Sequence, residues 1–112
     1  MDTATISLKQ AVINVLEDYI EFLKNDPDSQ PQLIIDEKNE RYLLIEMGWQ
    51  EQRRIYGVLI HMDIVDGKIW IQQDGTEDGV ASELVLLGIP KQQIVLGFKS
   101  ENRRRITEFA VS

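Results

Sequence analysis

The sequence predicts an α+β fold: an antiparallel sheet of about four to six strands, with an N-terminal helix and a second helix packed on one face. Two observations support this prediction. Residues 53–73 resemble two strands joined by Asp66-Gly67, the dipeptide favoured in two-residue hairpin turns. Apolar residues also recur every three or four positions near 4–24 and 77–87, which is typical of helices that cover a sheet.

The first helix is expected over residues 4–24. Asp2 or Thr3 can cap its start, and Asn25-Asp26-Pro27 ends it. Its main apolar stripe consists of Leu8, Val12, Val15, Leu16, Tyr19 and Leu23. Three further apolar residues, Ile13, Ile20 and Phe22, widen this stripe. Such a helix is covered on more than one side, either within its own chain or by a second subunit.

The strands follow in chain order. Residues 33–35 predict an edge strand, and residues 41–49, 53–65 and 68–73 predict the strands of a meander. The Asp66-Gly67 turn sets Met62 opposite Ile71 and His61 opposite Gln72. One face then carries Tyr56, Val58, Ile60, Met62, Ile64, Ile69 and Ile71. Leu43, Ile45 and Met47 join this face if the Gln50–Arg53 turn has an even number of loop residues. We expect the two helices to bury this face.

The opposite face mixes apolar and polar residues. It is predicted to carry a candidate protein interface made of Ile55, Leu59, His61, Asp63, Trp70 and Gln72. Trp is enriched at binding hot spots, which favours a dimer or partner interface. Cover by the C-terminal segment of the same chain is the equally weighted alternative.

The second helix is expected over 77–87, with Asp74-Gly75-Thr76 forming a turn and an N-cap before it, Gly88 ending it and Pro90 preventing its return. Residues 94–98 predict a further strand. The tail from Ser100 is basic and then apolar again, so it either adds a strand or lies over the sheet.

Composition indicates a single domain over residues 1–112. The chain has no cysteine, which excludes disulfides and thiolate chemistry, and no apolar run long enough to cross a membrane. Its start lacks the features of a secretory signal, so a cytoplasmic location is expected. Residues 1–52 carry 4 basic and 11 acidic side chains, whereas residues 53–112 carry 8 of each. An acidic first half repels DNA; simple solubility is the favoured explanation of this charge, and an acidic face that meets a basic partner is the alternative.

The chain offers little for catalysis. His61 and Asp63 point the same way on one strand and could form an acid–base pair, but no nucleophile with a recognisable motif accompanies them. Residues 74–85 imitate a calcium loop, yet the twelfth position is Val85 where a bidentate Glu is needed. We therefore expect no enzyme activity, no cofactor and no metal.

A candidate basic patch consists of Arg53, Arg54, Arg103, Arg104 and Arg105. Such a patch could grip phosphates. Glu101 and Glu108 flank the arginine triplet, however, and no helix-turn-helix pattern accompanies it. A solvated or protein-facing patch is favoured over a DNA site.

The stretches RRIYGVLIHMDIVDGKIWIQQDGTEDGVASEL, LLGIPKQQIVLGF and TEFAV resemble the XisI-like family, the fdxN-element excision controlling factors of cyanobacteria. This resemblance covers essentially the whole chain. It implies a controlling factor in programmed DNA excision during heterocyst differentiation, acting beside a site-specific recombinase and a second small protein, XisH. It implies no catalytic residues.

Two function classes follow. The first is a regulatory protein that contacts an XisH-like companion or a recombinase, itself a homo-oligomer such as a dimer. The second is an accessory protein that binds DNA directly through its arginines. The net charge favours the first.

Overall fold

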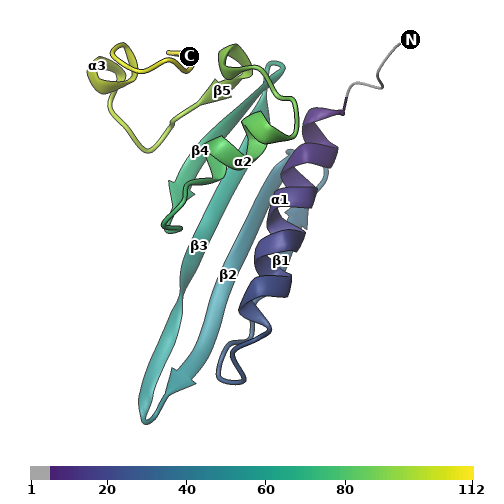
Figure 1. Ribbon diagram of the computed structural model, residues 1–112, viewed down its shortest axis with the longest axis vertical. Coiled ribbons are helices and arrows are strands. Elements are labelled where there is room, and N and C mark those ends of the chain that lie inside the picture. The colour runs from purple at the N-terminus through teal and green to yellow at the C-terminus, as the bar shows by residue number, and fades with distance from the viewer. Residues whose placement is uncertain (1–5) are drawn as a thin grey trace.

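The computed structural model describes residues 6–112, in which one five-stranded sheet carries two helices on the same face (Figure 1). The strands lie side by side in chain order: β1 (Gln32–Asp36), β2 (Arg41–Gln50), β3 (Arg53–Val65), β4 (Lys68–Asp74) and β5 (Ile94–Val95). β1 to β4 pair antiparallel, and β5 pairs parallel to β4. The helices are α1 (Leu8–Leu23), α2 (Val80–Leu86), α3 (Glu101–Arg104) and the 3₁₀ turn η1 (Lys91–Gln93). The predicted α+β architecture is confirmed.

Helix α1 begins later than predicted. Its N-cap is Ser7, whose hydroxyl accepts a hydrogen bond from the backbone N–H of Gln10 at 3.0 Å. This bond satisfies one of the N–H groups that a helix start leaves without an internal partner. Asp2 and Thr3, the predicted caps, lie outside the described residues. The helix ends at Leu23, one residue before the predicted end and just ahead of the predicted stop signal Asn25-Asp26-Pro27.

Helix α2 also begins later than predicted: it starts at Val80, and its N-cap residue is Gly79, which makes no side-chain cap. The Asp74 carboxylate accepts hydrogen bonds from the Val80 N–H at 2.9 Å and from the Thr76 N–H and hydroxyl. The Thr76 hydroxyl in turn accepts from the Gly79 N–H at 3.1 Å. Residues 75–79 therefore form a hydrogen-bonded loop, and the helix spans 80–86 instead of the predicted 77–87. Gly88, at φ +100°, follows its end as predicted.

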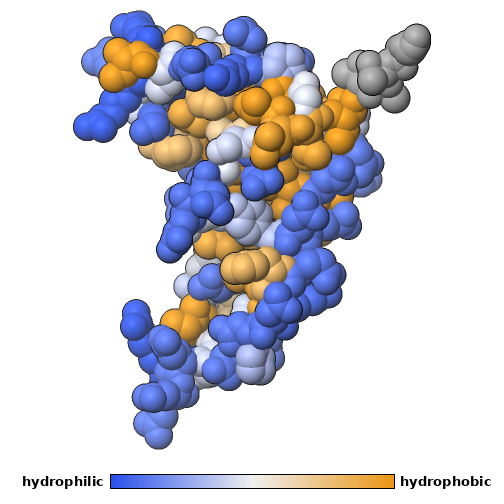
Figure 2. Space-filling model, in the orientation of Figure 1, coloured by the Kyte–Doolittle hydropathy of each residue, from blue (hydrophilic) through white to orange (hydrophobic). Residues whose placement is uncertain are grey.

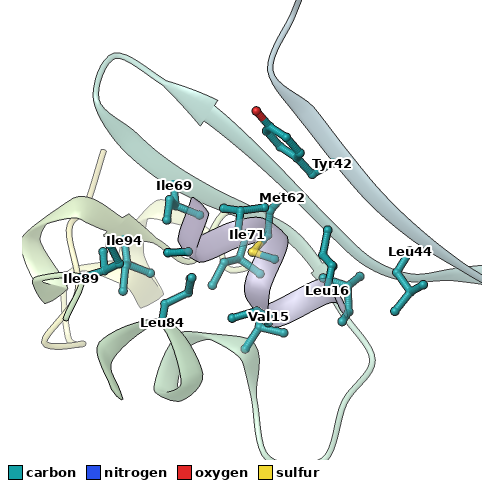
Figure 3. Close-up of a cluster of buried hydrophobic side chains, with 14 of the residues drawn as sticks. Val15, Leu16, Tyr42, Leu44, Met62, Ile69, Ile71, Leu84, Ile89 and Ile94 are labelled. Carbon is teal, nitrogen blue, oxygen red and sulfur yellow. The ribbon is translucent and has the colours of Figure 1, made fainter. Parts of the chain in front are cut away.

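The core lies between the sheet and these two helices (Figure 3). Ile60, Met62, Ile69 and Ile71 of the central hairpin are fully buried, as predicted, whereas Ile64, also predicted to be buried, is only partly so. They pack with Val12, Val15 and Leu16 of α1, Val80 and Leu84 of α2, Tyr42 and Leu44 of β2, and Ile89 and Ile94. The Asp66-Gly67 turn has both residues at positive φ, 50° and 75°, as the predicted turn requires.

A β-bulge at Leu59 divides the face that the sequence predicts to be continuous and buried. Leu44 pairs with Ile60 and Ile45 pairs with Val58, so Leu59 has no partner on β2. One extra residue reverses the side to which the following alternation points. Consequently Ile60 and Met62 face the helices, whereas Val58 and Tyr56 face away and are 39% and 66% exposed. The predicted burial of Tyr56 and Val58 is wrong.

A second bulge lies in β4. Met62 pairs with Ile71 as predicted, but His61 pairs with Gln73 because Gln72 is the extra residue. The predicted pairing of His61 with Gln72 is therefore wrong by one position.

The chain after α2 makes less strand than predicted. β5 contains only Ile94 and Val95, and the chain then turns, with the Phe98 N–H donating to the Ile71 carbonyl at 3.1 Å. The tail returns to the sheet as a single bridge between Ala110 and Val95. No helix within residues 6–112 is long and apolar enough to cross a membrane.

Candidate protein-interaction surfaces

Trp70 is half-buried under its own C-terminal segment. The Arg104 guanidinium lies 5.2 Å from the centre of the Trp70 ring. Arg104 also donates hydrogen bonds to the backbone carbonyls of Lys99 and Val111, each at 2.9 Å. Trp70 is directly opposite Asp63, as predicted. Trp70 is therefore covered by the C-terminal segment of its own chain, which was one of the two alternatives that the sequence left open.

The six predicted interface residues do not share one face. Leu59 packs against the core cluster and lines a hollow with Tyr19 and Leu23 of α1. Ile55 lines a second hollow on the same side, again with Leu23. The Leu59 bulge is the reason, because it reverses the alternation below Ile60. Ile55 and Leu59 therefore lie on the helix side of the sheet, away from Trp70.

His61, Asp63 and Gln72 form a small polar group beside Trp70. His61 Nε2 lies 2.8 Å from Asp63 Oδ1, and the Gln72 amide donates to Asp63 Oδ2 at 3.3 Å. Within residues 6–112 no three His, Cys, Asp or Glu side chains gather as a metal site would require. The Gln72–Asp63 bond joins β4 to β3, whereas His61 and Asp63 are neighbours on β3.

The five arginines of the predicted basic patch are not together. Arg53 and Arg54 lie at the free end of the β2–β3 hairpin, whereas Arg103 to Arg105 lie on or directly after α3, at the opposite end of the molecule (Figure 1). Arg104 is engaged with Trp70, and Arg105 pairs with Glu101 at 2.7 Å. The predicted single patch is therefore wrong as a geometric unit.

The face of the sheet turned away from α1 and α2 presents an apolar strip, which we call the open sheet face. Antiparallel partners share a face, and the pairs are Ile34–Leu43, Ile45–Val58, Met47–Tyr56 and Trp49–Arg54. Alternation with buried Tyr42 and Leu44 places this set away from the helices. Ile34, Trp49, Tyr56 and Val58 are 46%, 53%, 66% and 39% exposed.

Arg54 connects the two aromatic residues of this face. Its guanidinium lies 5.1 Å from the centre of the Trp49 ring and 5.9 Å from that of Tyr56. Such cation–π contacts hold a long side chain against the sheet. The three residues form the aromatic cluster, at the free end of a hairpin that extends past the end of α1 (Figure 1). Sequence reasoning missed Trp49 and Tyr56, because it assigned Tyr56 to the buried face.

The helix side of the molecule has a different surface. Hydrophobic side chains gather around α2, whereas the lower half, over the end of α1 and the hairpin, is mostly hydrophilic (Figure 2). The acidic surplus of the first half contributes to this hydrophilic region, with Glu17, Asp18 and Glu21 exposed on α1. The two sides of the sheet thus offer different chemistry to partners.

Comparison with known proteins identifies the family. The family model described as "XisI protein" matches residues 1–111. The fdxN element excision controlling factor XisI from Anabaena variabilis, known from a crystal structure, is 32% identical in sequence to this chain, with a TM-score of 0.78. The match covers 93% of this chain and 95% of that one. A XisI-like protein from the same species is 38% identical, with a TM-score of 0.71 and coverage of 90% and 99%. No curated protein matches. Sequence and fold agree over nearly the whole length, so this chain belongs to the XisI family.

Proposed function

We propose that this protein is a non-enzymatic controlling factor for DNA-element excision that acts by contacting another protein through its open sheet face. The similar Anabaena protein is named an fdxN element excision controlling factor, which supports the regulatory part of the proposal. The partner we propose is an XisH-like companion or the site-specific recombinase itself.

The observation that carries the proposal is the aromatic cluster of Trp49, Arg54 and Tyr56. Trp, Tyr and Arg are the three residue types most enriched where binding energy is concentrated. Here Arg54 lies against both rings on one face of a projecting hairpin. A partner that covers these groups removes two aromatic surfaces from water, and Arg54 can donate to its carboxylates or carbonyls.

The rest of the open sheet face suits a protein partner. Ile34, Leu43, Ile45, Met47 and Val58 form an apolar strip beside the aromatic cluster. Contiguous exposed apolar surface is uncommon on monomeric proteins and marks interaction sites. A surface that binds nucleic acid would instead carry Lys and Arg side chains placed to contact successive phosphates of the nucleic-acid backbone.

Direct DNA binding is the less favoured function. Arg53 and Arg54 lie far from Arg103 to Arg105, and Arg104 is committed to its contacts with Trp70 and the backbone. The net charge of −7 adds long-range repulsion. We expect no salt-sensitive binding of duplex DNA by the purified protein.

The proposal is tested by affinity purification of the tagged protein from native extract, followed by identification of co-purifying proteins. Wild type is compared with Tyr56→Ala and with Leu86→Ala, which removes an exposed side chain from α2 on the other side of the sheet. We expect a recombinase or small companion with wild type and Leu86→Ala, and its loss with Tyr56→Ala. Equal recovery with all three proteins would contradict the open sheet face as the contact.

A gel shift at low salt tests the alternative. A shift by wild type that is lost when Arg103, Arg104 and Arg105 are all replaced by alanine would favour direct DNA binding, because it would link affinity to these three arginines. We expect no shift with either protein.

A further inference from the structure

A groove runs along α1 on the helix side of the sheet, between that helix and the loop that leads into α2. It consists of two adjoining hollows of about 210 and 330 Å³, which share Tyr19, Phe22 and Asp78. We call it the α1 groove. Its apolar lining comes from Val15, Tyr19, Phe22, Leu23 and Leu59. Phe22, which lines both hollows, is 68% exposed, so apolar surface is open to a ligand there.

The charged lining of the α1 groove is all of one sign. Five carboxylates line it, those of Asp18, Glu46, Glu77, Asp78 and Glu83, and no Lys or Arg does. None of the five has an ion pair or a side-chain hydrogen bond within residues 6–112. The groove is therefore complementary to an apolar side chain flanked by cations.

The same chain presents a segment of that kind after β5. Ile106 is 86% exposed, more than any other large apolar side chain among the described residues. Arg103 and Arg105 are exposed beside it, while Arg104 turns inward onto Trp70. The segment 103–106 thus shows solvent one apolar side chain and two guanidinium groups.

The segment cannot reach the groove of its own molecule. α3 lies beyond β5 at one end of the sheet, whereas the groove follows the second half of α1, on the other side of α2 (Figure 1). A contact between the two complementary surfaces must therefore join different molecules.

We propose that copies of this chain associate head to tail, with residues 103–106 of one copy seated in the α1 groove of the next. Ile106 covers Phe22 and Tyr19, and Arg103 and Arg105 face the carboxylates on the groove walls. The Arg105–Glu101 pair is solvent-exposed, so its guanidinium can exchange partners at little cost. Because the two contacting surfaces differ, this interface is heterologous and can build a ring or a chain of copies.

The proposal is independent of the partner contact on the open sheet face. The groove and the aromatic cluster lie on opposite sides of the sheet, so both can be occupied together. Tyr56→Ala is expected to leave self-association unchanged, and loss of self-association is expected to leave the companion contact intact.

Sedimentation velocity over a concentration series, at low and high salt, tests the proposal with three double variants. The groove variant is Asp18→Lys with Asp78→Lys, and the segment variant is Arg103→Glu with Arg105→Glu. The control variant is Glu17→Lys with Glu21→Lys, which makes the same charge change on α1 at residues that do not line the groove. Thermal unfolding shows whether each variant is folded.

Wild type and the control variant are expected to self-associate, more weakly at high salt. The groove and segment variants are each expected to lose at least about tenfold in self-association, the effect of a modest change in contact energy. An equimolar mixture of these two variants is expected to associate again, because the arginines of one fit the unaltered groove of the other. A wild type that is monomeric throughout, a control as impaired as the groove variant, or a mixture that stays monomeric would each overturn the proposal. Capture of a different basic protein by a monomeric wild type would overturn it as well.

Discussion

Arg104 and Trp70 stack on one another, with 5.2 Å between the guanidinium carbon and the centre of the ring, and this contact fastens the C-terminal segment to β4. Arg104 also bridges two parts of that segment through the carbonyls of Lys99 and Val111. The residue that follows it in sequence, Arg105, is exposed; it pairs with Glu101 and also donates a hydrogen bond to Asn102 Oδ1 at 3.3 Å. Neighbouring arginines thus have separate roles.

Replacing Arg104 by alanine is expected to lower the free energy of unfolding by about 2–3 kcal/mol, since a stacked cation and two charge-assisted hydrogen bonds are lost. Arg105→Ala is the matched control, and its exposed ion pair predicts a loss of about 0.5 kcal/mol or less. Urea unfolding followed by tryptophan fluorescence measures both. Equal effects of the two substitutions would mean that Arg104 does not hold the segment.

The bulge at Leu59 predicts different costs for two neighbouring residues of β3. Ile60→Ala removes a fully buried side chain and is expected to cost about 2–5 kcal/mol. Val58→Ala, on the exposed side of the bulge, is expected to cost about 1 kcal/mol or less. Chemical denaturation of the two variants gives both values. A Val58→Ala cost as large as that of Ile60→Ala would restore the unbroken face that simple alternation predicts.

The bulge at Leu59 separates the part of the sheet that the sequence predicted correctly from the part that it did not. The Asp66-Gly67 turn fixed the register from Met62 to Ile71 because that turn type permits only one pairing. The α+β class and the burial of Ile60 and Ile71 followed from the apolar pattern. For the residues of β3 that precede Leu59, the predicted burial was wrong, because one unpaired residue reverses which side chains face the helices. The run Val58-Leu59-Ile60, three apolar residues in succession, is the signal that interrupts the alternation.

The interaction surfaces could not be predicted from the sequence, because they depend on tertiary contacts that the hydrophobic pattern does not encode. Predicting the open sheet face required knowing that Tyr56 and Trp49 lie on one side, which the bulge decides. Predicting that the arginines of the basic patch lie apart required knowing where α3 is placed. That position is set by the early end of β5 and the turn that follows it. The hydrogen bond from the Val80 N–H to the Asp74 carboxylate was missed because it spans six residues, beyond the usual capping motif.

Gly48 and Gly57 form a second matched pair for testing the fold. A Cβ at Gly48 would collide with the backbone carbonyl of Asp28, where the loop after α1 crosses β2. Gly48→Ala is therefore expected to cost about 1–3 kcal/mol, as overpacking does. Gly57→Ala meets nothing within 4 Å and is expected to be close to neutral. Thermal unfolding of both variants tests the placement of the loop; equal melting temperatures would contradict it.

Tyr42 predicts a loss of stability at alkaline pH. Burial of its side chain, which is 1% exposed, raises the pKa of the phenol above its ordinary value of 10.0. The fold therefore favours the neutral phenol, and this contribution is full below the unfolded-state pKa and is lost as pH rises through the folded-state pKa. The free energy of unfolding should fall above about pH 10.

Substituting phenylalanine for Tyr42 should flatten that alkaline fall, because no phenol remains to ionise. Tyr56→Phe, at a side chain that is 66% exposed, serves as the control and should keep the wild-type slope. Urea unfolding at a series of alkaline pH values gives the slopes. A wild-type slope retained by Tyr42→Phe would show that another group causes the loss.

The central claim, a partner held by the open sheet face, is tested most directly by titration calorimetry with the purified companion or recombinase. Tyr56→Ala and Trp49→Ala are each expected to weaken binding by about 2 kcal/mol or more, the loss typical of a hot-spot residue. Leu86→Ala, 80% exposed on α2, is expected to bind as wild type does. Wild-type affinity in both aromatic variants, or an equal loss in Leu86→Ala, would contradict the claim.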